Sequence, residues 1–119
     1  MGMEIHRQGG IAIVCPAGRL MGGPETEEFS GAVLQLMDEG NKCLVIDLSA
    51  VEFMNSVAIG QLIMFHGGYQ RRGGQMKLCG LRDRVASIFA SLKFSSLVFQ
   101  VHPGREEAVA SFEGRGCGG

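Results

Sequence analysis

A short, almost unbroken apolar run in the middle of the chain constrains the fold most. The run is Cys43-Leu44-Val45-Ile46-Asp47-Leu48. A continuous apolar stretch of this length is typical of a strand that is covered on both faces, as in a parallel sheet. Segments with apolar residues at helical spacing lie on both sides of it. The run therefore predicts an α/β protein.

Further strand-like and helix-like segments alternate along the chain. Strands are expected at residues 3–8, 11–17, 76–79 and 97–101, and the first two form a hairpin around Gly9-Gly10. Helices are expected to begin at Pro24, Ser56, Leu81 and Pro103. Residues 18–24 and 49–53 are expected to be loops. The order β-β-α-β-α-β-α-β-α predicts one domain over residues 1–113, with a mostly parallel sheet, an N-terminal antiparallel hairpin and a flexible Gly-rich tail at 114–119.

Composition excludes several classes of function. The 119 residues carry a net charge of −1, with acids and bases interspersed, so nucleic-acid binding is not expected. The densest basic spot, Arg71-Arg72 next to Lys77, is interpreted as a solvated helix end. No apolar run reaches the ~20 residues of a transmembrane helix, and the N-terminus lacks an apolar signal core. We expect a cytoplasmic protein that does not bind a membrane.

The cysteines show neither a metal-binding nor a disulfide pattern. Cys15, Cys43 and Cys79 lie in or beside apolar strands at wide spacings, without a Cys-x-x-Cys motif or a nearby histidine. They are interpreted as buried free thiols. Cys117 lies in the predicted tail. No metal or cofactor is expected, and no nucleophile–base pair suggests an enzyme.

The helix that begins at Ser56 has a start suited to a phosphate. Asn55 is a good N-cap because its side-chain oxygen can accept a hydrogen bond from an amide of the first turn. A phosphate on Ser56 would meet unpaired amides and the positive end of the helix dipole. From the residues alone, ordinary capping is the favoured interpretation, and the phosphate site is the alternative.

The same segment resembles the signature of a known family. It reads Asp47-Leu48-Ser49-Ala50-Val51-Glu52-Phe53-Met54-Asn55-Ser56-Val57-Ala58-Ile59-Gly60. It is similar to the STAS domains of anti-sigma-factor antagonists, which read roughly Asp-Leu-x-x-Val-x-Phe-Met-Asp-Ser-(Ser/Thr)-Gly-Leu-Gly. Three further stretches resemble the family in the right order: residues 17–20, 72–78 and 85–98.

The resemblance implies a regulatory binding module. By position, Ser56 is the residue that the kinase activity of a partner anti-sigma factor phosphorylates, and a Ser/Thr phosphatase resets it. The unphosphorylated form would bind that partner and free the sigma factor. The partner-binding residues that it implies, together with candidates at the start of the next helix, are Met21, Gly22, Gly23, Met54, Asn55, Ser56, Val57, Asp83 and Arg84.

Some alternatives stay open. From the residues alone, the favoured interpretation of Asp83 and Arg84 is a helix-start acid and a solvated cation. The segment departs from the family pattern at three positions: Asn55 is at the position of the family's Asp, Val57 at that of Ser or Thr, and Ala58 at that of Gly. A STAS domain that serves as an interaction or scaffold subunit of a signalling or transport complex, without phosphorylation, is the alternative function. A homodimer is also possible on this sequence.

Overall fold

The fold is taken from a computed structural model that describes residues 3–91 and 99–112. Its strands are β1 Glu4–Gln8, β2 Ile11–Cys15, β3 Gly18–Leu20, β4 Cys43–Asp47, β5 Val51–Met54, β6 Gln75–Cys79 and β7 Gln100–His102. Its helices are α1 Pro24–Asp38, α2 Ser56–Arg71, α3 Asp83–Ser91 and α5 Arg105–Ala110. None of the described helices is long and apolar enough to span a membrane.

Five strands form the central sheet in the order β1-β2-β4-β6-β7. The β1–β2 hairpin is antiparallel, and the other pairs of this sheet are parallel. Gly9 turns the hairpin with a φ of 64°, which glycine adopts without a steric penalty. The α/β class, the mostly parallel sheet and the N-terminal hairpin predicted from the sequence are confirmed.

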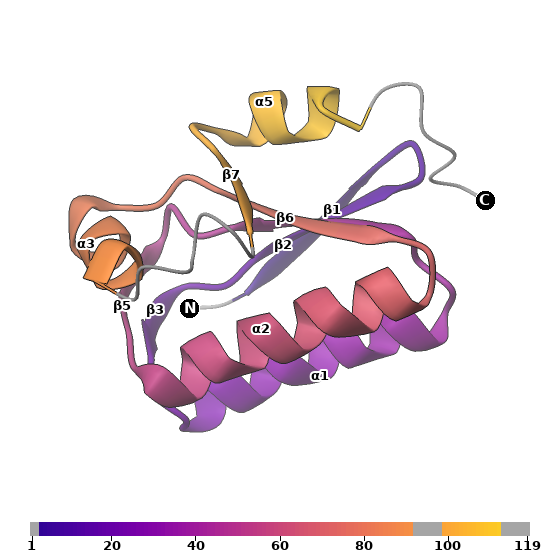
Figure 1. The fold of residues 1–119 in the computed structure, drawn as a ribbon. Coiled ribbons are helices and arrows are strands. Elements are labelled where there is room, and N and C mark those ends of the chain that lie inside the picture. The colour runs from indigo at the N-terminus through magenta and orange to yellow at the C-terminus, as the bar shows by residue number, and fades with distance from the viewer. Residues whose placement is uncertain (1–2, 92–98, 113–119) are drawn as a thin grey trace.

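The central strand β4 is buried on both faces, as its apolar run predicts. Leu44 and Ile46 point into the core beneath α1 and α2, whereas Cys43 and Val45 point into a smaller core beneath α5. This split follows from the two-residue period of a strand. Figure 1 shows α1 and α2 side by side on one side of the sheet and α5 on the other.

The larger core is held together by aromatic packing between the two long helices. Phe29 of α1 meets Phe65 of α2 edge to face, with their ring centroids 5.9 Å apart. Tyr69 of α2 is fully buried, and its hydroxyl donates to Asn41 Oδ1 at 2.7 Å. Burial raises the pKa of Tyr69, so its hydroxyl stays a neutral hydrogen-bond donor.

An ion pair fastens α5 to the sheet. Arg105, the first residue of α5, donates from Nε and Nη2 to Asp47 Oδ2 at 3.1 and 2.9 Å. The backbone N–H of Ser49 donates to the other oxygen of Asp47 at 3.0 Å. Burial alone would raise the pKa of Asp47, but these hydrogen bonds and the charge of Arg105 lower it below its usual value. The carboxylate is therefore charged throughout the neutral range.

We expect the stability of the fold to depend on the charge of Asp47. Because its pKa is lowered in the folded state, its contribution is present above the unfolded pKa of about 4 and is lost as the pH falls through the folded value. Asp47→Asn should reduce the free energy of unfolding by about 1–3 kcal/mol at pH 7. Urea unfolding from pH 7 to pH 3 should show the two proteins converging at acid pH. Asp38→Asn, at an exposed position, is the control, and an equal loss there would contradict the assignment.

Two segments expected as loops are strands instead. β3 and β5 pair in parallel as a second, two-stranded sheet. The expectation was wrong because three- and four-residue strands carry too little periodic signal, and tertiary pairing sets them. The last helix also begins two residues later than expected, at Arg105 rather than Pro103, because Gly104 takes the extended N-cap position.

Several other expectations are changed or lie outside the described residues. Lys77 is not part of a basic spot with Arg71-Arg72, because it is buried beneath α5 and donates to Ser111 Oγ at 2.7 Å. Cys43 is disulfide-bonded rather than a free thiol, whereas Cys15 and Cys79 are free. Wide spacing in the sequence did not reveal this pairing. Four expectations fall outside the described residues: the strand residues 97–98, the helix end at 92–93, the domain boundary at 113 and the tail at 114–119.

Candidate functional site

The small sheet places two distant segments side by side. In the β3–β5 register, Arg19 lies opposite Phe53 and Leu20 opposite Met54. Because β3 and β5 run in parallel and end at the paired, buried residues Leu20 and Met54, the chain that follows each strand emerges at the same edge of this sheet. β3 leads into the glycine loop 21–23, and β5 leads into α2. This pairing brings the loop to the start of α2.

Asn55 ties the glycine loop to the helix through three hydrogen bonds. Its side-chain Oδ1 accepts from the Ala58 N–H at 3.2 Å, which makes Asn55 the N-cap of α2. Its Nδ2 donates to the Met21 carbonyl at 3.0 Å. Its backbone N–H donates to the Leu20 carbonyl at 3.1 Å. The predicted cap is confirmed, and the tether to the loop adds a role that the sequence did not reveal.

Ser56 is the first residue of α2 and is exposed. Its hydroxyl forms no hydrogen bond with the described residues. The neighbouring Val57 is 52% exposed, and a Cβ at Gly22 would lie 3.5 Å from its side chain. Met21 is also about half-exposed. The Ser56 hydroxyl therefore lies at an accessible helix start beside an apolar patch of Met21 and Val57.

The predicted partner-binding residues do not all lie on this surface. Met54 is 1% exposed and belongs to the core, so it supports the site from below and offers a partner almost no surface. Gly22 has a φ of 92°, and its N–H donates to Thr26 Oγ1 at 2.9 Å. Gly23 is the extended N-cap residue of α1. The two glycines shape the loop, while Met21 supplies its exposed side chain.

A group that the sequence did not reveal extends the surface toward α3. Two guanidinium groups lie near the Phe53 ring, with the Cζ atoms of Arg19 and Arg84 5.2 Å and 5.9 Å from the ring centroid. The adjacent residue Asp83 begins α3 and is exposed. Arg82 donates to the Ser49 carbonyl at 3.0 Å and holds the start of α3 near β5. Within the described residues, no hydrogen bond or ion pair joins Asp83 or Arg84 to residues 55–57.

The histidine on the same helix as Ser56 packs against a phenylalanine ring and not against the serine hydroxyl. His66, which shares α2 with Ser56, packs its ring against Phe99 with the centroids 5.6 Å apart. Burial lowers the pKa of His66, and its Nδ1 is buried without a hydrogen-bond partner in the described structure. The half-buried ring lies about three helical turns from Ser56 along α2, not beside its hydroxyl.

A family model described as the STAS domain matches residues 3–108. The chain belongs to the STAS domain family. This family match agrees with the resemblance of the segment from Asp47 to Gly60, and the model spans both the small sheet and the start of α2.

Individual relatives are distant but cover nearly the whole chain. A Bordetella bronchiseptica protein named as a candidate anti-sigma factor antagonist, BtrV, is 24% identical over 113 residues, which are 95% of this chain and 96% of that one. A similarly named Thermotoga maritima protein has a structure with a TM-score of 0.83 at 18% identity, covering 92% of each chain. The Bacillus cell fate determinant SpoIIAA in its phosphorylated form gives a TM-score of 0.72 at 12% identity, covering 94% of this chain and 100% of that one. These structures share the STAS fold with this chain.

Proposed function

We propose that this STAS protein is an anti-sigma factor antagonist that is switched by phosphorylation of Ser56. In its unphosphorylated form it binds an anti-sigma factor with serine kinase activity, and phosphorylation of Ser56 by that kinase releases it. A Ser/Thr phosphatase removes the phosphate, and the cycle runs in the cytoplasm. The role assigned to this chain is that of a binding protein and kinase substrate, not of an enzyme.

The observation that carries the proposal is the position of Ser56. Its exposed hydroxyl opens a capped helix of 16 residues, beside the exposed side chains of Met21 and Val57. A partner that buries these apolar side chains also covers the hydroxyl. A phosphate there would bring about −1.5 to −2 charges into that contact. The name of BtrV, and the existence of SpoIIAA in a phosphorylated form, support the same role.

The Asn at position 55, where the family has Asp, has a structural explanation. Its Nδ2 donates to the Met21 carbonyl, and a carboxylate has no proton to donate there. The amide thus caps α2 and fixes the glycine loop at once. Asn55→Asp keeps the cap and the backbone hydrogen bond to the Leu20 carbonyl but loses the side-chain hydrogen bond to the Met21 carbonyl. The asparagine therefore adds one link that orders the loop, and this departure from the family pattern is compatible with an ordered partner surface.

Incubation with ATP and the anti-sigma-factor kinases of the same cell tests the proposal. Intact-mass spectrometry should show one added phosphate on the wild type and none on Ser56→Ala. Asn55→Asp, with the family's residue, should also be phosphorylated. Circular dichroism of each variant verifies that the fold is kept.

A second outcome would favour the scaffold function. Val57 and Ala58 place more bulk beside the serine than the family's small residues do. If no kinase modifies Ser56 and partner binding persists in Ser56→Asp, the protein is a constitutive interaction subunit and the switch is wrong.

A further inference from the structure

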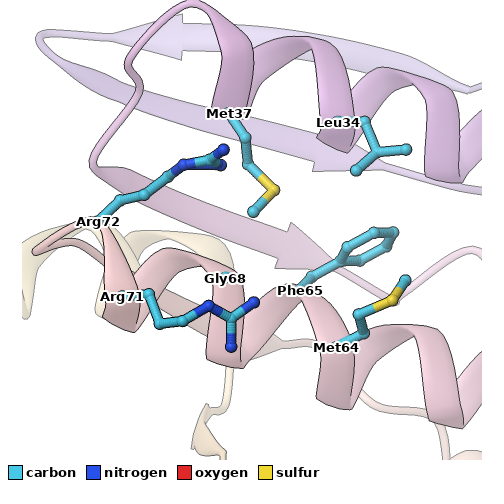
Figure 2. Close-up of a pocket in the computed structure, with 7 residues that line it drawn as sticks. All are labelled: Leu34, Met37, Met64, Phe65, Gly68, Arg71 and Arg72. Carbon is cyan, nitrogen blue, oxygen red and sulfur yellow. The ribbon is translucent and has the colours of Figure 1, made fainter.

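The outer face of the α1–α2 pair is open. Figure 1 shows the two helices side by side, with no other described element over their outer side. Leu34 and Met64 are 48% and 55% exposed at the middle of this face. A hollow of about 300 Å³ lies between the helices, and it is lined by Leu34, Met37, Met64, Phe65, Gly68, Arg71 and Arg72. Figure 2 shows how these residues lie.

The two ends of this face carry opposite charges. The helices run in the same direction, because Ser30 bonds Gln61 near their starts and the hollow joins their ends. Exposed Glu27 and Glu28 lie near the start of α1. The exposed Arg71-Arg72 pair closes α2. Among the described residues, none of these four side chains forms an ion pair.

The charges are spaced evenly about the apolar centre. Glu27 precedes Leu34 by seven residues, and Arg71 follows Met64 by seven residues. Each charge therefore lies about 10 Å along its helix from the centre, at 1.5 Å per residue. Asp38 and Lys42 also lie near the basic end, and their opposite charges cancel in the net charge of that end. Arg71 and Arg72 therefore supply its net positive charge.

We propose that this face binds a second copy of the chain. A two-fold axis that lies in the face and passes near Leu34 and Met64 reverses the helix direction in the second copy. The axis keeps α1 over α1 and α2 over α2. At each end, Glu27 and Glu28 of one copy therefore lie diagonally across from Arg71 and Arg72 of the other, one helix spacing (about 8–10 Å) to the side, while the apolar centres pack together. A foreign acidic helix would gain from Arg71 and Arg72 but would be repelled by Glu27 and Glu28. The face is thus more complementary to itself than to a partner of one charge.

The expected dimer is weak. Two helices of 15 and 16 residues, packed about 10 Å apart, present a face on the order of 450 Å². Standard stable interfaces bury about 800 Å² per partner. We therefore expect a dissociation constant between about 10 µM and 1 mM, weakened at least several-fold by 0.5 M NaCl because exposed charges contribute.

A charge swap tests the dimer without kinase or nucleotide, and so independently of Ser56. The variants Glu27→Lys/Glu28→Lys and Arg71→Glu/Arg72→Glu should each dimerise at least about tenfold more weakly than the wild type in sedimentation equilibrium, since each puts like charges together. An equimolar mixture of the two variants should associate again, because both ends then pair opposite charges. Glu106→Lys, on α5 at the other side of the sheet, should dimerise like the wild type.

Each alternative result has a clear meaning. A wild type that remains monomeric at 1 mM would overturn the proposal. So would variants that dimerise as well as the wild type, or a mixture that does not associate. Circular dichroism and thermal unfolding of both double variants should match the wild type, because all four side chains are exposed. Should one pair unfold, Leu34→Glu or Met64→Glu alone must abolish dimerisation for the proposal to stand.

Discussion

Ser56→Asp is expected to weaken binding of the anti-sigma factor at least about 100-fold, equivalent to about 2.7 kcal/mol. The reason is the setting of the hydroxyl beside exposed Met21 and Val57. A partner that covers those apolar side chains would remove the new carboxylate from water, and an uncompensated charge at an interface typically costs 2–5 kcal/mol. Isothermal titration calorimetry of both proteins against the same partner measures the change.

The same substitution is expected to leave the fold intact or to stabilise it. An acidic side chain in the first turn of a helix gains about 0.3–1 kcal/mol from the dipole, and Ser56 is the first residue of α2. Affinity and stability should therefore change in opposite directions. Gln70→Glu, an exposed position in the last turn of the same helix, adds the same charge and should bind the partner normally. Equal losses in the two variants would show that net charge, not the position of Ser56, controls binding.

Gly74→Ala is expected to reduce the free energy of unfolding by about 2–4 kcal/mol. Gly74 leads from α2 into β6, and a Cβ there would overlap the backbone of Lys42. The Lys42 carbonyl accepts the first hydrogen bond of the β4–β6 pairing, from Gln75 N–H at 2.8 Å. It cannot move away without breaking that bond. Chemical denaturation monitored by circular dichroism gives the change.

Gly60→Ala is the matched control for this effect. Gly60 lies within α2, and a Cβ there would have no neighbour within 4 Å. Alanine in a helix interior is favoured over glycine by about 0.5–1 kcal/mol. Gly60→Ala should therefore stabilise the protein while Gly74→Ala destabilises it. A loss of similar size in both would mean that overlap with Lys42 is not the cause.

The sequence predicted those parts of the fold whose signal is local. The run from Cys43 to Leu48 predicted a strand buried on both faces. The spacing of Phe29 and Val33 predicted a helix with one buried side. The structure confirms both predictions. β3 and β5 escaped prediction because their pairing joins residues more than 30 positions apart. Lys77 was misjudged for a related reason, since its neighbours Ser111 and Phe112 are distant in sequence.

At the candidate site, too, contacts between residues close in sequence could be predicted, and contacts between distant segments could not. Asn55 could be predicted as a cap because its partner Ala58 lies three residues away. The contacts of Phe53 with Arg19 and Arg84 could not, because three separate segments supply them. The position of Ser56 came from the resemblance to the STAS signature and not from spacing alone. Its phosphorylation stays a prediction that the kinase experiment tests.

The burial of Tyr69 determines what the intrinsic fluorescence of this protein reports. The chain has no tryptophan and one tyrosine, so Tyr69 dominates its intrinsic fluorescence. Because the ring is enclosed near the end of α2, its emission reports loss of the whole tertiary structure and is insensitive to events at the start of that helix. Phe53→Trp would place an indole near Arg19 and Arg84. That fluorophore would report partner docking, while Tyr69 continued to report unfolding in the same sample.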